Sequence, residues 1–317
     1  MANFDLIFDI GSAYVSAGLK KDGFIDKIPA VVAMDCDQIV AVGVDALRMA
    51  NARGTAIKLS NPILEGAIID VEGAKALVSS LLNRLVNYKM SVFSRYNVTC
   101  AVPCGMISSD KQTIESLFLS LGAKQVIFVE TPIADSRQLF NEFRARHGLV
   151  INIGYDCADL AIVTSNTIAA GCTLYHAGKH LTEAIMKKIE SKYLIKLTFE
   201  AAEYLKLNCA SLYPNESTVV TVGGQNAQSG ALEKVDITSK ELYDTVVDFV
   251  RKYVRIIQSL ISSVREDLAG LVRSGGIMLC GGGAKLAGLD MFLQNELNMP
   301  VYLAAFPDDV TTKGLLQ

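Results

Sequence analysis

One pattern occurs twice in this chain and constrains its fold more than any other feature. An apolar run at residues 4–10 leads into Asp-Ile-Gly at 9–11, and a second apolar run follows the glycine. The order recurs at residues 149–153, with Asn-Ile-Gly at 152–154 and another returning run. Each copy predicts a β-hairpin with a glycine in its turn. We therefore expect an internal duplication; the alternative is two unrelated units that both begin with a hairpin.

The remaining segments alternate between short apolar runs and stretches with apolar residues at helical spacing. Further strands are predicted at 28–34, 38–42, 97–102, 125–129, 219–222, 235–237 and 277–280, and helices at 70–86, 108–121, 184–191, 199–207 and 240–269. A chain of 317 residues is too long for one ordinary hydrophobic core. The sequence therefore predicts an α/β protein of two domains.

Charge and cysteine usage exclude several classes of protein. The formal net charge is −3, with acids and bases interleaved, so the basic surface that nucleic-acid binding requires is not expected. The seven cysteines form no CxxC pair and are expected to be free thiols. No apolar run reaches the roughly 18 residues of a membrane span, and Asp5 and Asp9 interrupt the only early apolar stretch. We expect a cytoplasmic protein.

Two loops carry residue types suited to phosphate chemistry. Residues 9–13 place an acid, a glycine and a hydroxyl where a strand ends, and the backbone N–H groups of such turns bind oxyanions. Asp9 would hold Mg²⁺ through water, because magnesium keeps most of its hydration shell. Three glycines at 281–283 follow a predicted buried strand and would let a flat ligand approach the backbone. An ordinary hairpin turn is the alternative interpretation of residues 9–13.

Seven segments resemble motifs of the bacterial MreB branch of the actin, heat-shock chaperone and sugar kinase superfamily. They lie at 41–49 (AVGVDALRM), 61–70 (NPILEGAIID), 101–105 (AVPCG), 122–126, 129–132 (VETP), 176–178 and 202–206 (AEYLK). The match runs from about residue 5 to residue 314 with near-uniform spacing.

This resemblance implies two ribonuclease-H-like domains of the actin-like ATPase type around a nucleotide cleft. The implied division is 1–138 plus 303–317, with a small subdomain at about 30–72, and 139–302, with a small subdomain at about 182–240.

The resemblance also implies the ligands, ATP or ADP with Mg²⁺, and the residues that contact them. The cofactor-binding positions that it implies are Asp9, Gly11, Ser12, Ala13, Asn152, Gly154, Gly178, Glu203, Lys206, Gly281, Gly282 and Gly283. Glu203 and Lys206 are expected near the ribose and adenine, and the three glycines near the adenosine. A solvated helix face is the alternative for Glu203 and Lys206.

The second phosphate loop departs from the family pattern DxGGGTT. Asn152 replaces an acid by a neutral amide, which is a poorer anchor for magnesium-bound water. Tyr155 and Asp156 replace two glycines. Asp156 would place a negative charge near the β- and γ-phosphates, where two unit charges ~4 Å apart repel by about 4 kcal/mol at an effective dielectric constant of about 20.

The position of the water-activating glutamate is also altered. The family motif places that glutamate just before a proline, where this chain has Thr131. Thr131 can orient a water but cannot act as a general base near pH 7. Glu130 precedes it, and on an extended segment the two side chains would point to opposite faces. We therefore expect weak or absent ATP hydrolysis.

The resemblance implies a cytoskeletal protein, related to cell-shape determinants, that binds ATP and forms filaments. A non-polymerising regulator of an active homologue is the first alternative, and a small-molecule kinase of the same superfamily is the second. Met90, Val92 and Phe93 occupy the place of the family's apolar loop and would attach the protein to the inner face of the membrane. A loop packed on its own domain is the alternative for this segment.

Overall fold

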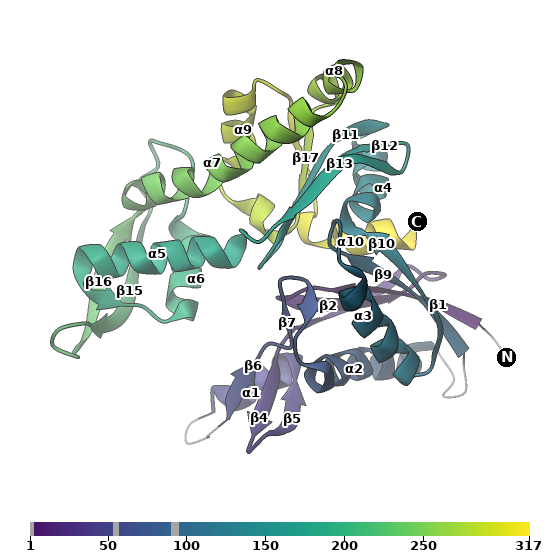
Figure 1. Cartoon of the computed structure of the whole chain (residues 1–317). Helices are drawn as coiled ribbons and strands as arrows, with labels where there is room; N and C mark the ends of the chain where they lie inside the picture. Colours follow the sequence, from purple (N-terminus) through teal and green to yellow (C-terminus); the bar gives the residue numbers. More distant parts are fainter. Residues whose placement is uncertain (1–2, 53–56, 90–94) are drawn as a thin grey trace.

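Two five-stranded sheets with the same strand order form the centre of the molecule (Figure 1). The computed structural model describes residues 3–52, 57–89 and 95–317. The first sheet has the order β10-β9-β1-β2-β3 and the second has the order β18-β17-β11-β12-β13. In each sheet a three-stranded antiparallel meander is followed by two strands that join it in parallel. This shared topology confirms the internal duplication predicted from the repeated hairpin.

The strands of the two sheets fall close to the predicted segments. The first sheet contains β1 (Asn3–Ile10), β2 (Tyr14–Leu19), β3 (Phe24–Pro29), β9 (Arg95–Val102) and β10 (Ala123–Glu130). The second contains β11 (His147–Ile153), β12 (Ala158–Thr164), β13 (Thr167–Leu174), β17 (Ile277–Cys280) and β18 (Val301–Leu303). Strands β11 and β12 are almost entirely buried because helices cover both faces of this sheet, which is why they appear as continuous apolar runs.

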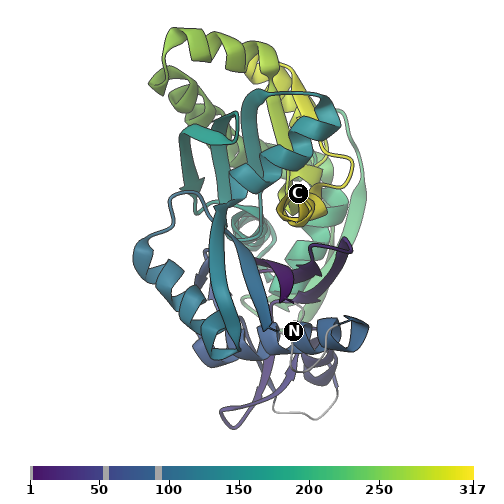
Figure 2. The ribbon, with the colours of Figure 1, turned by 90° about the vertical axis from the view of Figure 1, so that its right-hand side faces the viewer.

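Helices pack on each sheet and between them. On the first sheet lie α2 (Val71–Lys89) and α3 (Ser108–Ser120); on the second lie α7 (Ser239–Ser263), α8 (Glu266–Gly275) and α9 (Leu289–Leu297). Between the sheets, α4 (Thr131–Phe143) packs against α10 (Val310–Leu316), and α10 also contacts β1 (Figures 1 and 2). The C-terminal helix therefore lies at the junction of the two halves.

Each half carries a small peripheral unit. The first is a sheet of β4 (Val32–Asp35), β5 (Gln38–Val42) and β6 (Lys58–Ser60) with α1 (Gly43–Ala50), and a short hairpin of β7 (Ile63–Leu64) and β8 (Ala67–Ile68) follows it. The second is a sheet of β14 (Ile195–Lys196), β15 (Val219–Asn226) and β16 (Leu232–Thr238) beside α5 (Gly178–Tyr193) and α6 (Phe199–Cys209). Figure 1 shows both units projecting to the same side of the molecule.

Helix boundaries follow from capping and apolar spacing. At the start of α7, the Thr238 side chain accepts a hydrogen bond from the Glu241 N–H, while Glu241 accepts one from the Thr238 N–H. This reciprocal capping box satisfies two backbone donors that the helix leaves free. One face of α7 then supplies ten buried residues, and most of them enter the large core of the second half.

Four predictions about local structure were wrong. The strand expected at 28–34 is two strands, because the chain passes from one sheet to another at Ala30 and Val31. The helix expected at 240–269 breaks at Val264, which has extended backbone angles. The strand expected at 219–222 continues to Asn226 and includes Gly224, where a larger residue is excluded because a Cβ would come within 2.5 Å of the Ile195 side chain. Thr131 begins a helix rather than continuing an extended segment.

Candidate functional site

A cavity of about 740 Å³ lies between the two halves, and both repeated hairpin turns border it. The other walls come from α5, α6, the short 3₁₀ helix η1 (Gly282–Lys285) and the segment before α10, which includes the 3₁₀ helix η2 (Pro307–Asp309). Of the sites predicted from sequence, the following line it: Asp9, Gly11, Ser12, Ala13, Thr131, Asn152, Gly154, Gly178, Glu203, Lys206, Gly281, Gly282 and Gly283. Residues distant in sequence thus meet at one opening.

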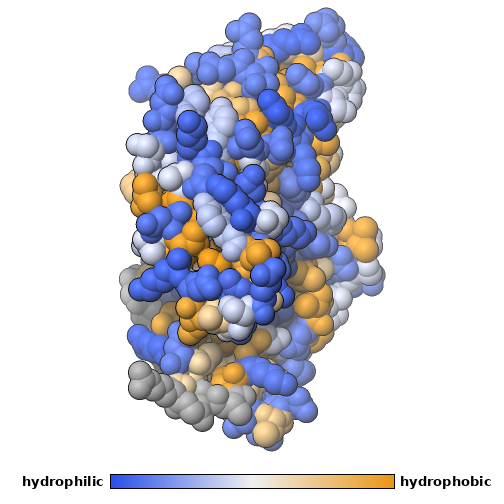
Figure 3. Space-filling model, turned by 90° about the vertical axis from the view of Figure 1, so that its left-hand side faces the viewer, coloured by the Kyte–Doolittle hydropathy of each residue, from blue (hydrophilic) through white to orange (hydrophobic). Residues whose placement is uncertain are grey.

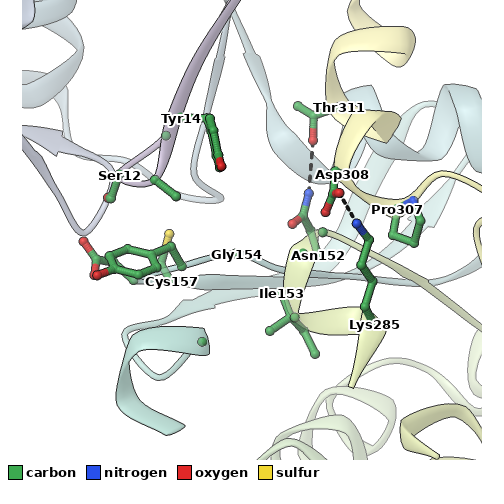
Figure 4. Close-up of a pocket in the computed structure, with 18 of the residues that line it drawn as sticks. Ser12, Tyr14, Asn152, Ile153, Gly154, Cys157, Lys285, Pro307, Asp308 and Thr311 are labelled. Carbon is green, nitrogen blue, oxygen red and sulfur yellow. Dashed lines mark hydrogen bonds and ion pairs between the residues drawn. The ribbon is translucent and has the colours of Figure 1, made fainter. Parts of the chain in front are cut away.

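The two turns have the same internal hydrogen bond. In the first, the Gly11 N–H donates to the Tyr14 carbonyl at 3.0 Å; in the second, the Gly154 N–H donates to the Cys157 carbonyl at 3.0 Å. Figure 4 shows Ser12 and Tyr14 on one side of the opening, with Gly154 and Cys157 on the other. Backbone N–H groups in such paired turns are suited to bind an anion between them.

Asp9 is the acid next to the first turn; it is the penultimate residue of β1 and borders the cavity. Burial raises the pKa of its carboxyl to about 6, and the charge of Lys27 partly opposes that rise. Among the described residues, no group of three or more His, Cys, Asp or Glu side chains is placed to hold a metal. Asp9 therefore fits Mg²⁺ only as an anchor for bound water, with phosphate oxygens completing the shell.

Asn152 is occupied by a network behind the cavity wall. Its side-chain nitrogen donates to Asp135 Oδ2 at 2.8 Å and to Thr311 Oγ1 at 3.1 Å, and the Thr311 hydroxyl donates to Asp135 Oδ1 at 2.7 Å. Figure 4 shows the bond between Asn152 and Thr311. Burial raises the pKa of Asp135 to about 7. Sequence reasoning missed Asp135 and Thr311; the one available signal was an acid within the apolar stretch that follows Pro132.

The two candidate catalytic residues, Thr131 and Glu130, lie in different surroundings. Thr131 borders the cavity, and its hydroxyl donates to the Val102 carbonyl at 3.0 Å. The Glu130 carboxylate instead accepts from the Gly105 N–H at 2.8 Å, and Glu130 is not among the residues that line the cavity. At the position where the family pattern places its water-activating glutamate, the cavity is thus bordered by a hydroxyl, which cannot remove a proton near pH 7.

Glu203 and Lys206 neutralise each other on the wall formed by α5 and α6. Lys206 Nζ lies 2.8 Å from Glu203 Oε2 and donates to the Gly178 carbonyl at 3.0 Å. Glu203 also accepts a hydrogen bond from the Thr182 hydroxyl. Lys206 has only 11% of its side chain exposed, so it is more than a solvated residue on a helix face. The pair presents polar atoms to the cavity and links the two helices.

The glycines after β17 allow a close approach between that strand and β11. A Cβ at Gly281 would lie 2.4 Å from the Asn152 Oδ1 atom, and one at Gly283 would lie 2.3 Å from Ile153. Gly281 also has a φ of +80°, which favours glycine. These glycines therefore have a packing role as well as a place on the cavity wall.

The residues at the outer end of the cavity were only partly predicted from the sequence. Apolar residues that sequence reasoning missed line it: Leu207, Ala210, Leu286 and Ala287. Lys285 forms an ion pair with Asp308 beside them (Figure 4). This apolar slot, with a few polar groups at its rim, has the usual lining of a small-molecule site.

The surface gives no independent support for membrane attachment. Met90, Val92 and Phe93 lie outside the described residues, so their expected role stays a prediction. Within the described parts of the chain, no helix is long and apolar enough to cross a membrane. The face in Figure 3 is mainly hydrophilic, with its apolar side chains in separate groups.

Known proteins resemble this chain over its whole length. The family model described as MreB/Mbl protein matches residues 3–317. The cell shape-determining protein Mbl of Bacillus subtilis is 27% identical over 314 residues, which cover 98% of this chain and 94% of that protein. The cell shape-determining protein MreB of Escherichia coli is 24% identical over 322 residues, covering 99% and 92%.

Solved structures share the fold. MreB5 of Spiroplasma citri bound to AMPPNP superposes with a TM-score of 0.91 at 24% identity, covering 99% of this chain and 95% of that one. The same protein bound to ADP gives 0.90 at 25% identity with the same coverage. The MamK double helical filament gives 0.84 at 16% identity, covering 99% and 98%. With its two actin-like halves and a family match from residue 3 to residue 317, the chain belongs to the MreB/Mbl family.

Proposed function

We propose that this chain is an actin-like cytoskeletal protein that binds an adenine nucleotide in the cavity and assembles into filaments. The cavity itself carries the proposal, because both phosphate-type turns and an apolar slot border one space of about 740 Å³. A structural relative holds AMPPNP or ADP, and another forms a double helical filament. In this proposal the adenine would lie near Leu286, and the phosphates would lie between the two turns.

The proposed moving bodies are residues 1–138 with 303–317 and residues 139–302. Helix α4 contacts both sheets, so it is the element about which the halves would turn. A ligand that contacts both turns favours the closed arrangement over the open one, and closure favours assembly if only closed subunits fit together. Head-to-tail contacts between closed subunits would then give an open polymer.

Hydrolysis is proposed to be slow. When Mg²⁺-nucleotide is bound, the ion supplies charge neutralisation at the phosphates; Asp9 would hold it through water, and the turns would orient the phosphate oxygens. Thr131 offers no base to the attacking water, and the Asn152 amide is held by Asp135. Both features favour a site that binds nucleotide and changes the domain arrangement over a site that hydrolyses ATP rapidly.

Sedimentation tests this function directly. The protein is centrifuged at high speed with Mg-ADP, with Mg-AMPPNP or without nucleotide, and negative-stain microscopy examines the pellet. Nucleotide-dependent pelleting of filaments is the expected result. Binding of nucleotide without any assembly would instead support the alternative, a non-polymerising regulator. That alternative is favoured by the missing base at Thr131, and co-sedimentation with an active homologue distinguishes the two.

A further inference from the structure

Asp156 makes a direct contact between the two halves of the molecule. It lies in the second hairpin turn with 2% of its surface exposed, and it borders the cavity. Its Oδ2 accepts a hydrogen bond of 3.2 Å from the backbone N–H of Glu65, which is 91 residues away in the first half. Glu65 and Gly66 form the tip of the β7–β8 hairpin, and Gly66 also borders the cavity.

The second oxygen of this carboxylate accepts no hydrogen bond from the described residues. Asp156 Oδ1 is buried, and no hydrogen-bond donor reaches it within the described part of the chain. Lys179 Nζ lies 3.7 Å away, which is within ion-pair range but beyond a hydrogen bond. A buried acceptor without a donor costs free energy, so Asp156 does not stabilise the fold through this oxygen by a hydrogen bond.

Other carboxylates surround the same turn. The pKa of the Cys157 thiol is raised by burial, and then by the charges of Asp159, Asp156, Asp9 and Glu65, so these groups converge on the turn from both halves. Asp159 is itself fixed, because it accepts a hydrogen bond from the Cys104 N–H at 2.9 Å. The inner end of the cavity is therefore rich in carboxylates before any phosphate enters.

We propose that Asp156 takes the place of a terminal phosphate, so that the cleft selects a nucleoside diphosphate over a triphosphate. A γ-phosphate between the turns would accept hydrogen bonds from backbone N–H groups of both halves. The Asp156 carboxylate already accepts such a bond from the Glu65 N–H. A third phosphate would have to displace this bond and approach the charge of Asp156. The inference rests on the proposed nucleotide site and names the nucleotide state that the site accepts.

Isothermal titration of the purified protein with Mg-ADP and with Mg-AMPPNP tests the proposal. The wild-type chain is expected to bind ADP at least tenfold more tightly than AMPPNP. Asp156→Asn keeps an oxygen for the Glu65 N–H, removes the charge and frees Lys179 for a phosphate. It is expected to tighten AMPPNP about tenfold while ADP changes less than threefold.

Asp308→Asn is the matched control, because Asp308 borders the outer end of the same cavity and pairs with Lys285. It is expected to shift both affinities together and leave their ratio unchanged. Equal wild-type affinities, or a ratio that Asp156→Asn does not change, would overturn the inference while leaving the nucleotide site intact. If folded wild-type protein binds neither nucleotide, both the inference and the proposed site fail. The wild-type ratio needs no variant, so a poorly folding Asp156→Asn does not remove the test.

Discussion

The side-chain amide of Asn152 donates a 2.8 Å hydrogen bond to the carboxylate of Asp135, which is fully buried behind the cavity wall. An aspartate at position 152 would bring two carboxylates to that distance, where both cannot be ionised together. The amide at 152 is therefore matched to the acid at 135, and the two positions form a unit that also includes Thr311.

Asn152→Asp is expected to destabilise the fold by about 3 kcal/mol at pH 8, because it replaces the hydrogen-bond donor to the buried Asp135 carboxyl by a second acceptor. The double variant Asp135→Asn, Asn152→Asp reverses donor and acceptor and is expected to recover most of the loss. Urea unfolding followed by circular dichroism measures both, since the chain has no tryptophan. A single variant as stable as the wild type would show that the network does not act as a unit.

Stability is expected to fall as pH rises from about 4 to about 7. Burial raises the pKa of Asp9 and Asp159 to about 6 and that of Asp135 to about 7, from the ordinary carboxyl value of 3.8. In this window the folded chain binds more protons than the unfolded chain, so each pH increment lowers the free energy of unfolding.

Urea unfolding at pH 5 and at pH 7.5 measures this slope, and Asp135→Asn is expected to reduce it. Asp290, which is only partly buried, offers a matched control, because Asp290→Asn replaces a carboxylate outside the buried cluster. A slope that Asp135→Asn leaves unchanged would assign the pH dependence to other groups.

The periodicity of apolar residues predicted most of the fold, because burial dictates which residues face a sheet. The repeated hairpin led to the correct duplication, and the buried strands β1 and β11 were located within two residues. Breaks such as Val264 could not be found in this way, since the apolar spacing continues through them. The start of α4 at Thr131 was missed for a related reason: Pro132 suits the first turn of a helix as well as a loop.

The site was predicted where local sequence determines backbone shape, and missed where contacts between distant residues determine it. The two glycine turns are local and lie at the cavity as the family pattern implied. The partner of Asn152 is Asp135, and the partner of Asp156 is the backbone of Glu65; neither contact leaves a trace in sequence spacing. The effect of Asp156 was therefore anticipated as simple repulsion, without its bond between the halves.

Gly314→Ala is expected to destabilise the protein by about 3 kcal/mol or more, because a Cβ there would lie 1.8 Å from the Ala134 carbonyl oxygen. The clash would separate α10 from α4 at the junction of the two halves. Gly270→Ala is the matched control: this helical glycine is exposed, has no atom within 4 Å of its Cβ position, and should gain roughly 0.5–1 kcal/mol. Thermal unfolding of both variants checks the contrast; equal melting temperatures would contradict the tight packing of α10.

Lys206→Met is expected to weaken ADP and AMPPNP binding alike, by about tenfold, or ~1.4 kcal/mol. The change leaves Glu203 without its partner at 2.8 Å and removes the donor to the Gly178 carbonyl. Lys196→Met is the control, because Lys196 pairs with Glu190 on the exposed surface. Both variants are titrated with both nucleotides. An equal loss of affinity for ADP and AMPPNP at Lys206→Met differs from the changed ratio of the two affinities that is expected for Asp156→Asn.

Phosphate release from ATP should appear when the inner cavity has both a glycine at position 156 and a carboxylate at position 131. Asp156→Gly removes the charge that excludes a third phosphate, and Thr131→Glu then places a carboxylate at the start of α4, beside the cavity. A general base contributes on the order of 10²-fold or more to such a step, so the double variant should release phosphate from Mg-ATP about 10²-fold faster than Asp156→Gly alone. Asp156→Gly with Thr131→Gln has the same shape without the base and should remain slow. Equal rates for the Glu and Gln variants would mean that Thr131 does not lie where the attacking water is activated.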